Sequence, residues 1–355
     1  MQSLSSSGYS DRVLGYADLI SDDTKWLARR MAGIGASEAG AALGVSPWKD
    51  PLELYLEKLR PPPKPDKGVD SGPRAWGNRL ELPILQWYAE TTGHTVYTAQ
   101  ELCFRLDPET QCPMTDDFQR LLNAIEEHAE VDFIGGGKII FRSKLWPALI
   151  YSPDALLWDH SVDEPGTVDA KLTGESDRRG WKDQTPPDVL AQLVHSMCVM
   201  GCSFAQVAVL FGDCQSGTRN HDRNEADIRA HVDGVNDFWR RLCEGRPPAV
   251  RGSKSDARAL RSMVPREADG LRIVLPLEAE GVAEDFLLHS RQLRAHSKKR
   301  EIARVKLMGM MGIAEYGECA DGTVVRMRTS ADGKRRVHVK PGDDGSLDGW
   351  QDPTI

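Results

Sequence analysis

Two short apolar segments joined by a polar break constrain the fold more than any other part of the chain. The first segment is Tyr151–Trp158 and the second is Val168–Leu172, and the break between them, residues 159–166, carries Pro-Gly. Such a break is typical of a turn, so the two segments predict adjacent strands of a hairpin. Residues two apart on a strand project from the same face, which places Asp169 beside Lys171.

The predicted hairpin groups two carboxylates, Asp154 and Asp169, with the ammonium of Lys171. Hard divalent cations prefer carboxylate oxygens, and a neighbouring ammonium can position water. The pattern therefore suits metal-assisted hydrolysis of a phosphodiester. An Asp-x-Lys pattern on a half-exposed strand is also frequent as a solvated face without a function. The choice between these interpretations depends on the rest of the sequence.

The length and composition limit the class of protein. At 355 residues the chain predicts one sizeable domain, residues 22–250, with a C-terminal appendage, residues 251–355, after a polar and flexible N-terminus of residues 1–21. We find no apolar run that could span a bilayer and no signal peptide. The seven cysteines are scattered without a Cys-x-x-Cys pair, which indicates reduced thiols and a cytoplasmic protein. The net charge of −8 argues against a general nucleic-acid coat protein, but it allows a local basic groove.

The order of predicted elements indicates an α/β fold. Helical patterns come first, then the hairpin, then a helix at residues 187–200 and a strand at residues 205–211. This order predicts a central mixed β-sheet flanked by helices. On one of the early helices, Glu81 follows Trp76 by five residues and lies beside apolar positions. It would be a fixed metal ligand if that flank faced the sheet, and otherwise a solvated glutamate.

The appendage differs in kind from the domain before it. Residues 280–310 predict one long helix, which carries seven Lys/Arg against one Glu between His289 and Lys306. This stretch is either a solvated helix face or a contact for nucleic acid. Two alternating segments, Thr323–Thr329 and Arg335–Val339, flank Ala331-Asp-Gly333 and predict a β-hairpin.

Six sequence blocks in a fixed order resemble the YqaJ-type viral recombinase family. That family is related to the phage lambda exonuclease within the PD-(D/E)xK, or restriction-endonuclease-like, nuclease fold. The resemblance covers about residues 22–250. The blocks are Arg29-Arg-Met-Ala-Gly-Ile-Gly-Ala-Ser-Glu38, Gly44-Val-Ser-Pro-Trp48 with Pro51-Leu-Glu-Leu-Tyr55, Trp76-Gly-Asn-Arg-Leu-Glu81, Ser152-Pro-Asp154, Asp169-Ala-Lys171 and Gln192-Leu-Val-His-Ser-Met197.

The resemblance implies a specific activity. It is that of a Mg²⁺- or Mn²⁺-dependent 5′-to-3′ exonuclease, with two metal ions, that resects double-stranded DNA ends for phage or prophage recombination. It further implies a single-strand annealing protein as the partner, a homotrimer, and a place in the cytoplasm of a bacterial host. The basic helix and terminal hairpin also resemble tails of this family.

The resemblance assigns roles to individual residues. Glu81, Asp154 and Asp169 match the metal-binding carboxylates, with the backbone carbonyl of Ala170 as a further ligand. Lys171 matches the catalytic lysine, and Gln192 matches a glutamine that faces the site. The residues that match or assist the receptor for a terminal 5′-phosphate are Arg30, Ser37 and Ser152.

Three departures from the family pattern are visible. Asp169 stands where the family commonly has Glu, which is one methylene longer. His195 stands in a part of the helix where relatives often carry other residues, and is either a DNA contact or a packed histidine. Residues 105–144 exceed the usual spacing and predict an insertion that contacts DNA or decorates the surface.

Two alternative functions remain at this point. One is another nuclease of the same fold, either an endonuclease or a CRISPR-adaptation-like enzyme. The latter usually carries a cysteine-ligated iron–sulfur cluster, for which the scattered cysteines offer no ligand set. The other is a catalytically inactive DNA-binding recombination protein, which the intact set Glu81, Asp154, Asp169 and Lys171 disfavours.

Overall fold

The chain divides into two compact units, Met1–Glu267 and Ala268–Ile355. The structure is a computed structural model that describes residues 22–61, 72–107, 110, 112, 114–174, 178–181, 184–263, 272–330 and 335–340. The predicted flexible N-terminus, residues 1–21, and the predicted turn Ala331–Gly333 lie outside these residues. None of the helices in the described ranges is both long and apolar enough to cross a membrane.

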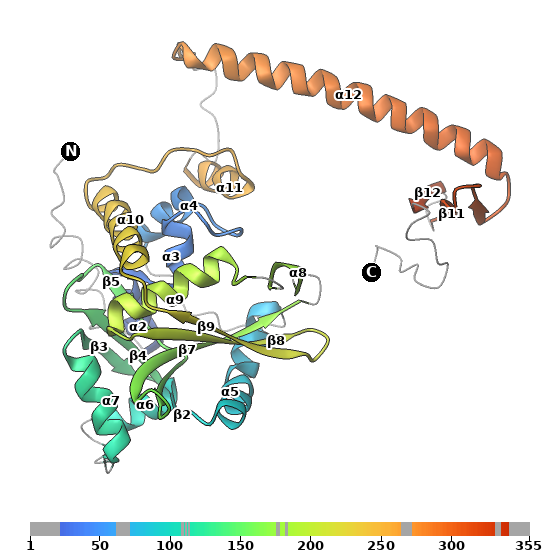
Figure 1. Cartoon of the computed structure of the whole chain (residues 1–355). Coiled ribbons are helices and arrows are strands. Elements are labelled where there is room, and N and C mark those ends of the chain that lie inside the picture. The colour runs from blue at the N-terminus through green and yellow to red at the C-terminus, as the bar shows by residue number, and fades with distance from the viewer. Residues whose placement is uncertain are drawn as a thin grey trace. The chain divides into compact units, whose positions relative to one another are not determined.

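The first unit is built on a five-stranded sheet with the order β2-β6-β7-β8-β9. Its strands β7 and β8 are parallel and its other neighbouring pairs are antiparallel, so the sheet is mixed. The prediction of a central mixed sheet flanked by helices is confirmed (Figure 1). The strands are β2 (Thr95–Thr98), β6 (Ala155–Asp159), β7 (Glu164–Thr173), β8 (Phe204–Phe211) and β9 (Ser216–Asp222).

The predicted hairpin is β6 and β7, which pair antiparallel with Ala155 opposite Val168. The connection is shorter than predicted, because β7 already begins at Glu164 and Pro-Gly lies inside the strand. Gly166 is needed there for space, since a Cβ atom on it would lie 2.5 Å from the Phe204 ring of the neighbouring strand. The turn itself uses Asp163, whose φ of 61° is left-handed, a conformation that Asp tolerates better than most residues.

One face of this sheet is covered by α5 (Pro73–Thr92). Its residues Ile84, Leu85 and Tyr88 are buried in one cluster with Leu157 and Val168 of the hairpin. Glu81 precedes Ile84 and Leu85 by three and four positions, which is the spacing of one helix face. The sheet-facing side of α5 therefore carries Glu81 toward the hairpin.

The opposite face is covered by α9 (Pro187–Met200), which has the bounds predicted for the helix after the hairpin. Leu193 and Met197 are buried in one cluster with Leu156 of β6 and Val207 of β8. Successive residues of a strand point to opposite faces, so Leu156 faces α9 and Leu157 faces α5. This double cover, visible in Figure 1, explains why β6 is apolar without alternation.

A second sheet of the first unit contains part of residues 105–144, the segment predicted as an insertion that contacts DNA or decorates the surface. The sheet has the order β1-β5-β4-β3, with β1 (Ile34–Gly35), β5 (Leu149–Tyr151), β4 (Lys138–Ser143) and β3 (Ala129–Gly135). The helix α7 (Asp116–Glu126) buries Phe118, Leu121 and Ile125 in the main core. The buried residues of this segment, among them Phe118, Leu121 and Ile139, therefore belong to the core, while many of its other described residues are exposed.

The remaining helices of the first unit complete its core. The residues up to 107 form α2 (Asp22–Met31), α3 (Ala36–Ala42), α4 (Pro51–Lys58) and α6 (Ala99–Leu106), and the later ones form α8 (Arg178–Trp181), α10 (Glu225–Cys243) and α11 (Lys254–Met263). The helix α11 packs on α4, and its residues Ser255, Asp256 and Ala259 are buried. The first unit thus extends past residue 250, where the domain boundary was predicted, and includes α11.

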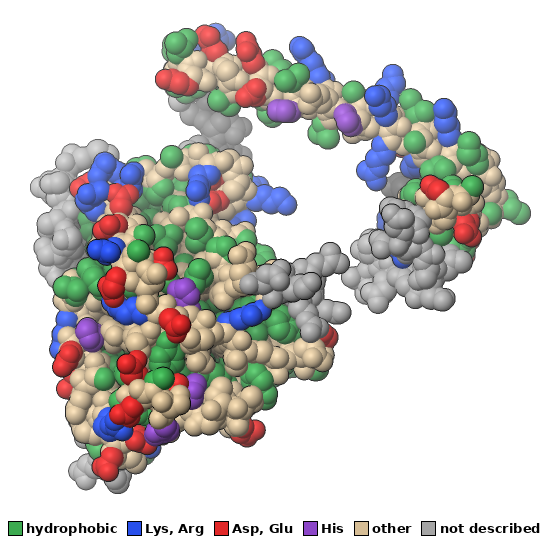
Figure 2. All heavy atoms as spheres, in the orientation of Figure 1, with side chains coloured by type: hydrophobic (Ala, Val, Ile, Leu, Met, Phe, Trp, Pro, Cys, Tyr) green, Lys and Arg blue, Asp and Glu red, His purple; other side chains and the backbone are tan. Residues whose placement is uncertain are grey.

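The second unit contains α12 (Glu278–Met311) and a three-stranded sheet, β10 (Tyr316–Glu318), β11 (Val324–Thr329) and β12 (Arg335–Lys340). The predicted long helix and hairpin are present, and β10 is an additional strand. No described residue of α12 is buried. Figure 2 shows acidic side chains near one end of α12 and basic side chains along the rest, which matches its sequence.

The position of α11 predicts a difference between two truncations. A chain that ends after residue 250 loses the buried face of α11, whereas a chain that ends after residue 263 keeps it. We expect the shorter chain to be less stable by about 1–3 kcal/mol, which is typical of lost buried contacts. Thermal unfolding measures this as a lower melting temperature. Equal melting temperatures of the two truncated chains would contradict the packing of α11 on the first unit.

Candidate active site

Asp154 is fixed to the strand that carries the other hairpin residues. It directly precedes β6, and its Oδ2 accepts a hydrogen bond of 2.9 Å from the backbone N–H of Ala170 in β7. The N–H and C=O of one strand residue point to the same side. The carbonyl of Ala170 therefore points toward Asp154, as a further oxygen at this place.

Asp169 is a buried carboxylate with one oxygen left over. Its side chain is 1% exposed, and its Oδ1 accepts a hydrogen bond of 3.2 Å from the Tyr151 hydroxyl. Gln192 of α9 also donates to this carboxylate. Among the described residues, Oδ2 of Asp169 has no hydrogen-bond partner. Because an unpaired buried carboxylate oxygen is costly, the site is suited to a cation or a proton at this atom.

The three carboxylates repel one another. Burial, followed by the charge of Asp154, raises the pKa of Glu81 to about 7, although Lys171 opposes this. Burial also raises the pKa of Asp169 to about 7, against the lowering effect of Lys171. The pKa of Asp154 is raised by burial as well. Glu81 from α5 and both aspartates thus share one electrostatic environment, with Lys171 as the opposing charge.

The donor set fits a hydrated hard cation better than a closed metal cage. Within the part of the chain that is described, no group of three or more His, Cys, Asp or Glu residues could hold a metal ion by itself. Mg²⁺ needs only one or two carboxylates and keeps several waters. The unpaired oxygen of Asp169 and the nearby Asp154 meet that requirement. Five residues predicted from the sequence therefore meet at one place, namely Glu81, Asp154, Asp169, Lys171 and Gln192.

Arg30 and Ser37 also come together as predicted. Arg30 lies in the last turn of α2 and Ser37 lies in the first turn of α3. Nη2 of Arg30 donates a 2.8 Å hydrogen bond to the Ser37 hydroxyl. The Arg30 guanidinium also lies 4.9 Å from the centroid of the Trp26 ring. Ser37 is exposed and Arg30 is half-buried, so an anion can reach both side chains.

Lys58 is a residue of this region that the sequence reasoning missed. It is 1% exposed, and its Nζ lies 2.8 Å from each of three acceptors: Oε2 of Glu38 and the carbonyl oxygens of Arg30 and Gly33. Burial lowers the pKa of Lys58, which Glu38 opposes. Lys58 therefore fixes the backbone on both sides of the turn after α2. Its spacing from Leu54 and Tyr55 on the apolar face of α4 was the signal for a buried lysine.

Ser152 is placed differently from the other two predicted phosphate ligands. Its hydroxyl donates a 2.8 Å hydrogen bond to the carbonyl of Ile139 in β4. This bond ties the segment between β5 and β6 to the second sheet. The hydroxyl proton of Ser152 is thus already donated to a backbone carbonyl. Among the described residues, no contact joins Ser152 to Arg30 or Ser37.

His195 is a packed histidine, which is one of the two interpretations that its sequence allowed, and not a DNA contact. Its side chain is 0% exposed. Its Nε2 lies 3.1 Å from the carbonyl oxygen of Ile150, and its Nδ1 lies 3.0 Å from Nε2 of His231 in α10. A carbonyl only accepts, so Nε2 of His195 carries the proton and Nδ1 accepts from His231. The pair joins α9 to α10 and β5 inside the core.

The histidine pair predicts a loss of stability in acid. Burial lowers the pKa of His195 to about 4, and burial with the His195 charge lowers that of His231 to about 3, against about 6.5 when unfolded. Both rings stay neutral in the fold, so stability is complete above pH about 6.5 and falls toward pH 4 as the unfolded chain takes up protons. His231→Gln removes one titrating ring and keeps a donor for His195. Between pH 7 and 5 we expect it to lose roughly 1–2 kcal/mol less than the unmodified chain.

Urea unfolding at the two pH values measures this difference. His160→Gln, on the exposed turn between β6 and β7, is the matched control and should follow the unmodified chain. An identical pH dependence of the unmodified chain and His231→Gln would contradict the buried neutral pair.

The chain resembles known proteins in part of its sequence. Residues 25–120 match the family described as the YqaJ-like viral recombinase domain. Over 297 residues the chain is 23% identical to the uncharacterized protein YqaJ of Bacillus subtilis (strain 168), which covers 82% of this chain and 79% of that protein. The resemblance stated from the six sequence blocks is therefore confirmed.

Similar solved structures include exonucleases. An alkaline exonuclease from Laribacter hongkongensis, LHK-Exo, has a TM-score of 0.40 and 15% identity, over 61% of this chain and 91% of its own. The same protein in complex with dAMP has a TM-score of 0.41 and 14% identity, over 67% and 96% of the two chains. A phage-related exonuclease from Haemophilus somnus 129PT has a TM-score of 0.34 and 11% identity, over 60% and 94%.

Proposed function

With the match of residues 25–120 to the YqaJ-like viral recombinase domain as the premise, we propose that this chain is a recombination-related nuclease. The observation that carries the proposal is the convergence of Glu81, Asp154, Asp169 and Lys171. They come from α5, the start of β6 and the middle of β7, and Gln192 of α9 hydrogen-bonds Asp169. One buried and two partly buried acids with one lysine suit hydrolysis of a phosphodiester.

The proposed cofactor is Mg²⁺ or Mn²⁺, with two ions engaged during cleavage. Asp154, Asp169, Glu81 and the Ala170 carbonyl would hold the ions. A bound divalent cation would supply positive charge that stabilises the attacking and leaving oxygens of the phosphate. Support comes from the unpaired oxygen of Asp169 and from the raised pKa values of Glu81 and Asp169, because an added positive charge relieves both.

In the proposed reaction, other side chains orient the water, position Asp169 and bind the terminal phosphate. Lys171 orients a water molecule, whose oxygen bonds to phosphorus while the bond from phosphorus to the 3′ oxygen breaks. Gln192 and Tyr151 hold Asp169 in place by hydrogen bonds. Each cleavage leaves a 5′-phosphate on the next nucleotide. Arg30 and Ser37 would bind that group, since a guanidinium fork matches phosphate oxygens.

The finer proposal is 5′-to-3′ digestion of double-stranded DNA ends in phage or prophage recombination within a bacterial cytoplasm. The resemblance also supports a single-strand annealing partner and a homotrimer.

Among the alternative functions, a CRISPR-adaptation-like nuclease with an iron–sulfur cluster is disfavoured by the high pKa of two buried cysteines. Burial raises the pKa of Cys198 and of Cys202 to about 12, and metal ligation needs thiolates. An endonuclease or an inactive DNA-binding protein is separated by the cleavage test below.

Substitution of the central residues should abolish cleavage. We expect Asp154→Ala and Lys171→Ala to lower the rate at least about 100-fold, the lower range for a group that assists proton transfer. Loss of a linear DNA duplex with Mg²⁺ or Mn²⁺, against a chelator, measures the rate. Lys144→Ala, at an exposed lysine, is the matched control. Cleavage of closed circles would favour an endonuclease, and metal-independent or unchanged cleavage in Lys171→Ala would contradict the proposed site.

Arg30 should determine the preference for a phosphorylated end. On a duplex with a 5′-phosphate at one end and a 5′-hydroxyl at the other, we expect faster loss of the phosphorylated strand. Arg30→Ala should make the two strands disappear at similar rates. Arg29→Ala is the matched control, because the neighbouring Arg29 pairs with Asp132 at 3.7 Å instead. An unchanged preference in Arg30→Ala would refute the assigned phosphate contact.

A further inference from the structure

A pocket with aromatic walls opens beside Lys171. It has a volume of about 1120 Å³, and its described lining includes Lys171 together with Trp48, Trp76 and Trp181. The three tryptophans come from the loop before α4, from α5 and from α8. The pocket thus lies against one of the residues proposed to act on the scissile phosphate.

Two of the tryptophans leave large apolar surfaces in contact with water. Trp48 is 73% exposed and Trp76 is 52% exposed, whereas Trp181 is 6% exposed and packs edge-on against Phe211 at 6.3 Å between ring centroids. Tryptophan normally buries much of its ring on folding. Two exposed indoles on the wall of one pocket therefore indicate a ligand with a flat apolar face.

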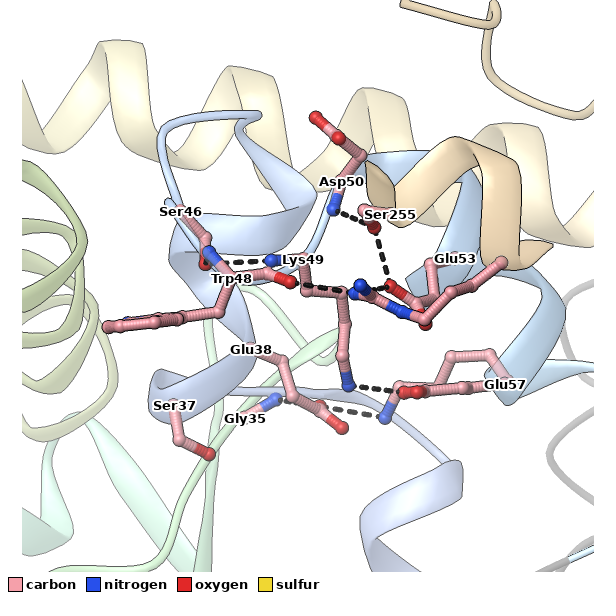
Figure 3. Close-up of polar contacts among 12 residues, drawn as sticks. Gly35, Ser37, Glu38, Ser46, Trp48, Lys49, Asp50, Glu53, Glu57 and Ser255 are labelled. Carbon is pink, nitrogen blue, oxygen red and sulfur yellow. Dashed lines mark hydrogen bonds and ion pairs between the residues drawn. The ribbon is translucent and has the colours of Figure 1, made fainter. Parts of the chain in front are cut away.

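The loop that carries Trp48 is held in place by α11. The Trp48 carbonyl accepts a 3.0 Å hydrogen bond from Nη2 of Arg258. Arg258 also pairs with Glu53 of α4 at 2.8 Å. The Trp48 N–H donates to the Ser46 hydroxyl at 3.2 Å. Figure 3 shows the Trp48 ring pointing away from this polar network. The backbone is therefore anchored while the ring remains free to contact a ligand.

Trp76 is coupled to the carboxylate site through α5. It lies five residues before Glu81 on the same helix. The guanidinium of Arg79 lies 5.3 Å from the centroid of the Trp76 ring, which is within the range of a cation–π contact. A rigid helix thus fixes the spacing between this ring and an acid of the proposed active site.

We propose that Trp48 and Trp76 stack an unpaired nucleobase of the DNA strand whose phosphate lies at Lys171. This inference rests on the proposed nuclease function and names a base-binding subsite for it. Stacking suits a nuclease without sequence preference, because every base has a π-face. The wall residues Gly174, Gly180 and Gly212 have no side chains, which leaves room for a base. The duplex end must separate for its base to enter this pocket.

The affinity for DNA is measured in the presence of a chelator, so that binding is observed without metal-dependent cleavage. Duplexes carry the fluorescent base 2-aminopurine at the recessed 5′ nucleotide, and a second set carries an abasic site there. We expect the fluorescence to be quenched on binding. Trp48→Ala and Trp76→Ala should each weaken binding by about 5- to 150-fold, the range for one stacked base. The same loss should follow from the abasic site, with no further loss in the variants. Trp48→Phe should restore most of the binding, since phenylalanine also stacks.

The same binding assay includes a control variant and can contradict the proposed subsite. Phe104→Ala removes an exposed aromatic ring elsewhere, on α6, and should change nothing. Unquenched fluorescence, or equal affinity of the unmodified chain for intact and abasic ends, would overturn the subsite. If cleavage with Mg²⁺ occurs while these binding results fail, the subsite is wrong and the nuclease stands. If quenching is seen but no metal ion gives cleavage, the nuclease is wrong and base stacking stands.

Discussion

The hydrogen bond from the Ala170 N–H to the Asp154 carboxylate is the contact on which the proposed site depends. It joins the start of β6 to the middle of β7 and holds two acids beside each other in a poorly hydrated place. Burial of such charges destabilises the fold unless they are paired. Tyr151 and Gln192 form hydrogen bonds with Asp169 and offset part of that cost. Lys171 offsets another part of that cost.

Local sequence signals predicted the parts of the fold that are defined by neighbours along the chain. The β6–β7 hairpin follows from two apolar segments and a polar break, and α9 begins at Pro187 and ends before Gly201, as its sequence indicates. The order of such elements also predicted the mixed sheet. In the candidate site, the assignment of Glu81 depended on the resemblance to the family, because its position on the helix alone did not distinguish a metal ligand from a solvated acid. Arg30 and Ser37 required it as well.

Long-range contacts explain what the sequence did not reveal. Residues 105–144 were interpreted as an insertion because they exceed the usual spacing of the family. Their strands β3 and β4 pair with each other and then with β5, and this sheet is completed by β1, which lies far earlier in the chain. The helix α11 lies beyond a Pro-Pro break, yet Arg258 reaches Glu53 of α4. This contact also orients the loop with Trp48. A boundary read from local composition could not detect it. Asp169, which stands where the resemblance leads one to expect the longer Glu, is held directly by Tyr151 and Gln192.

The central claim is that the buried acids form a site for a divalent cation next to Lys171. Crystals grown with Mn²⁺ and without DNA test it most directly, because manganese scatters X-rays anomalously. We predict an anomalous peak within ligand distance of Asp154 and Asp169, and its loss in crystals of Asp169→Asn. No peak at saturating Mn²⁺, or a peak that contacts neither aspartate, would contradict the account.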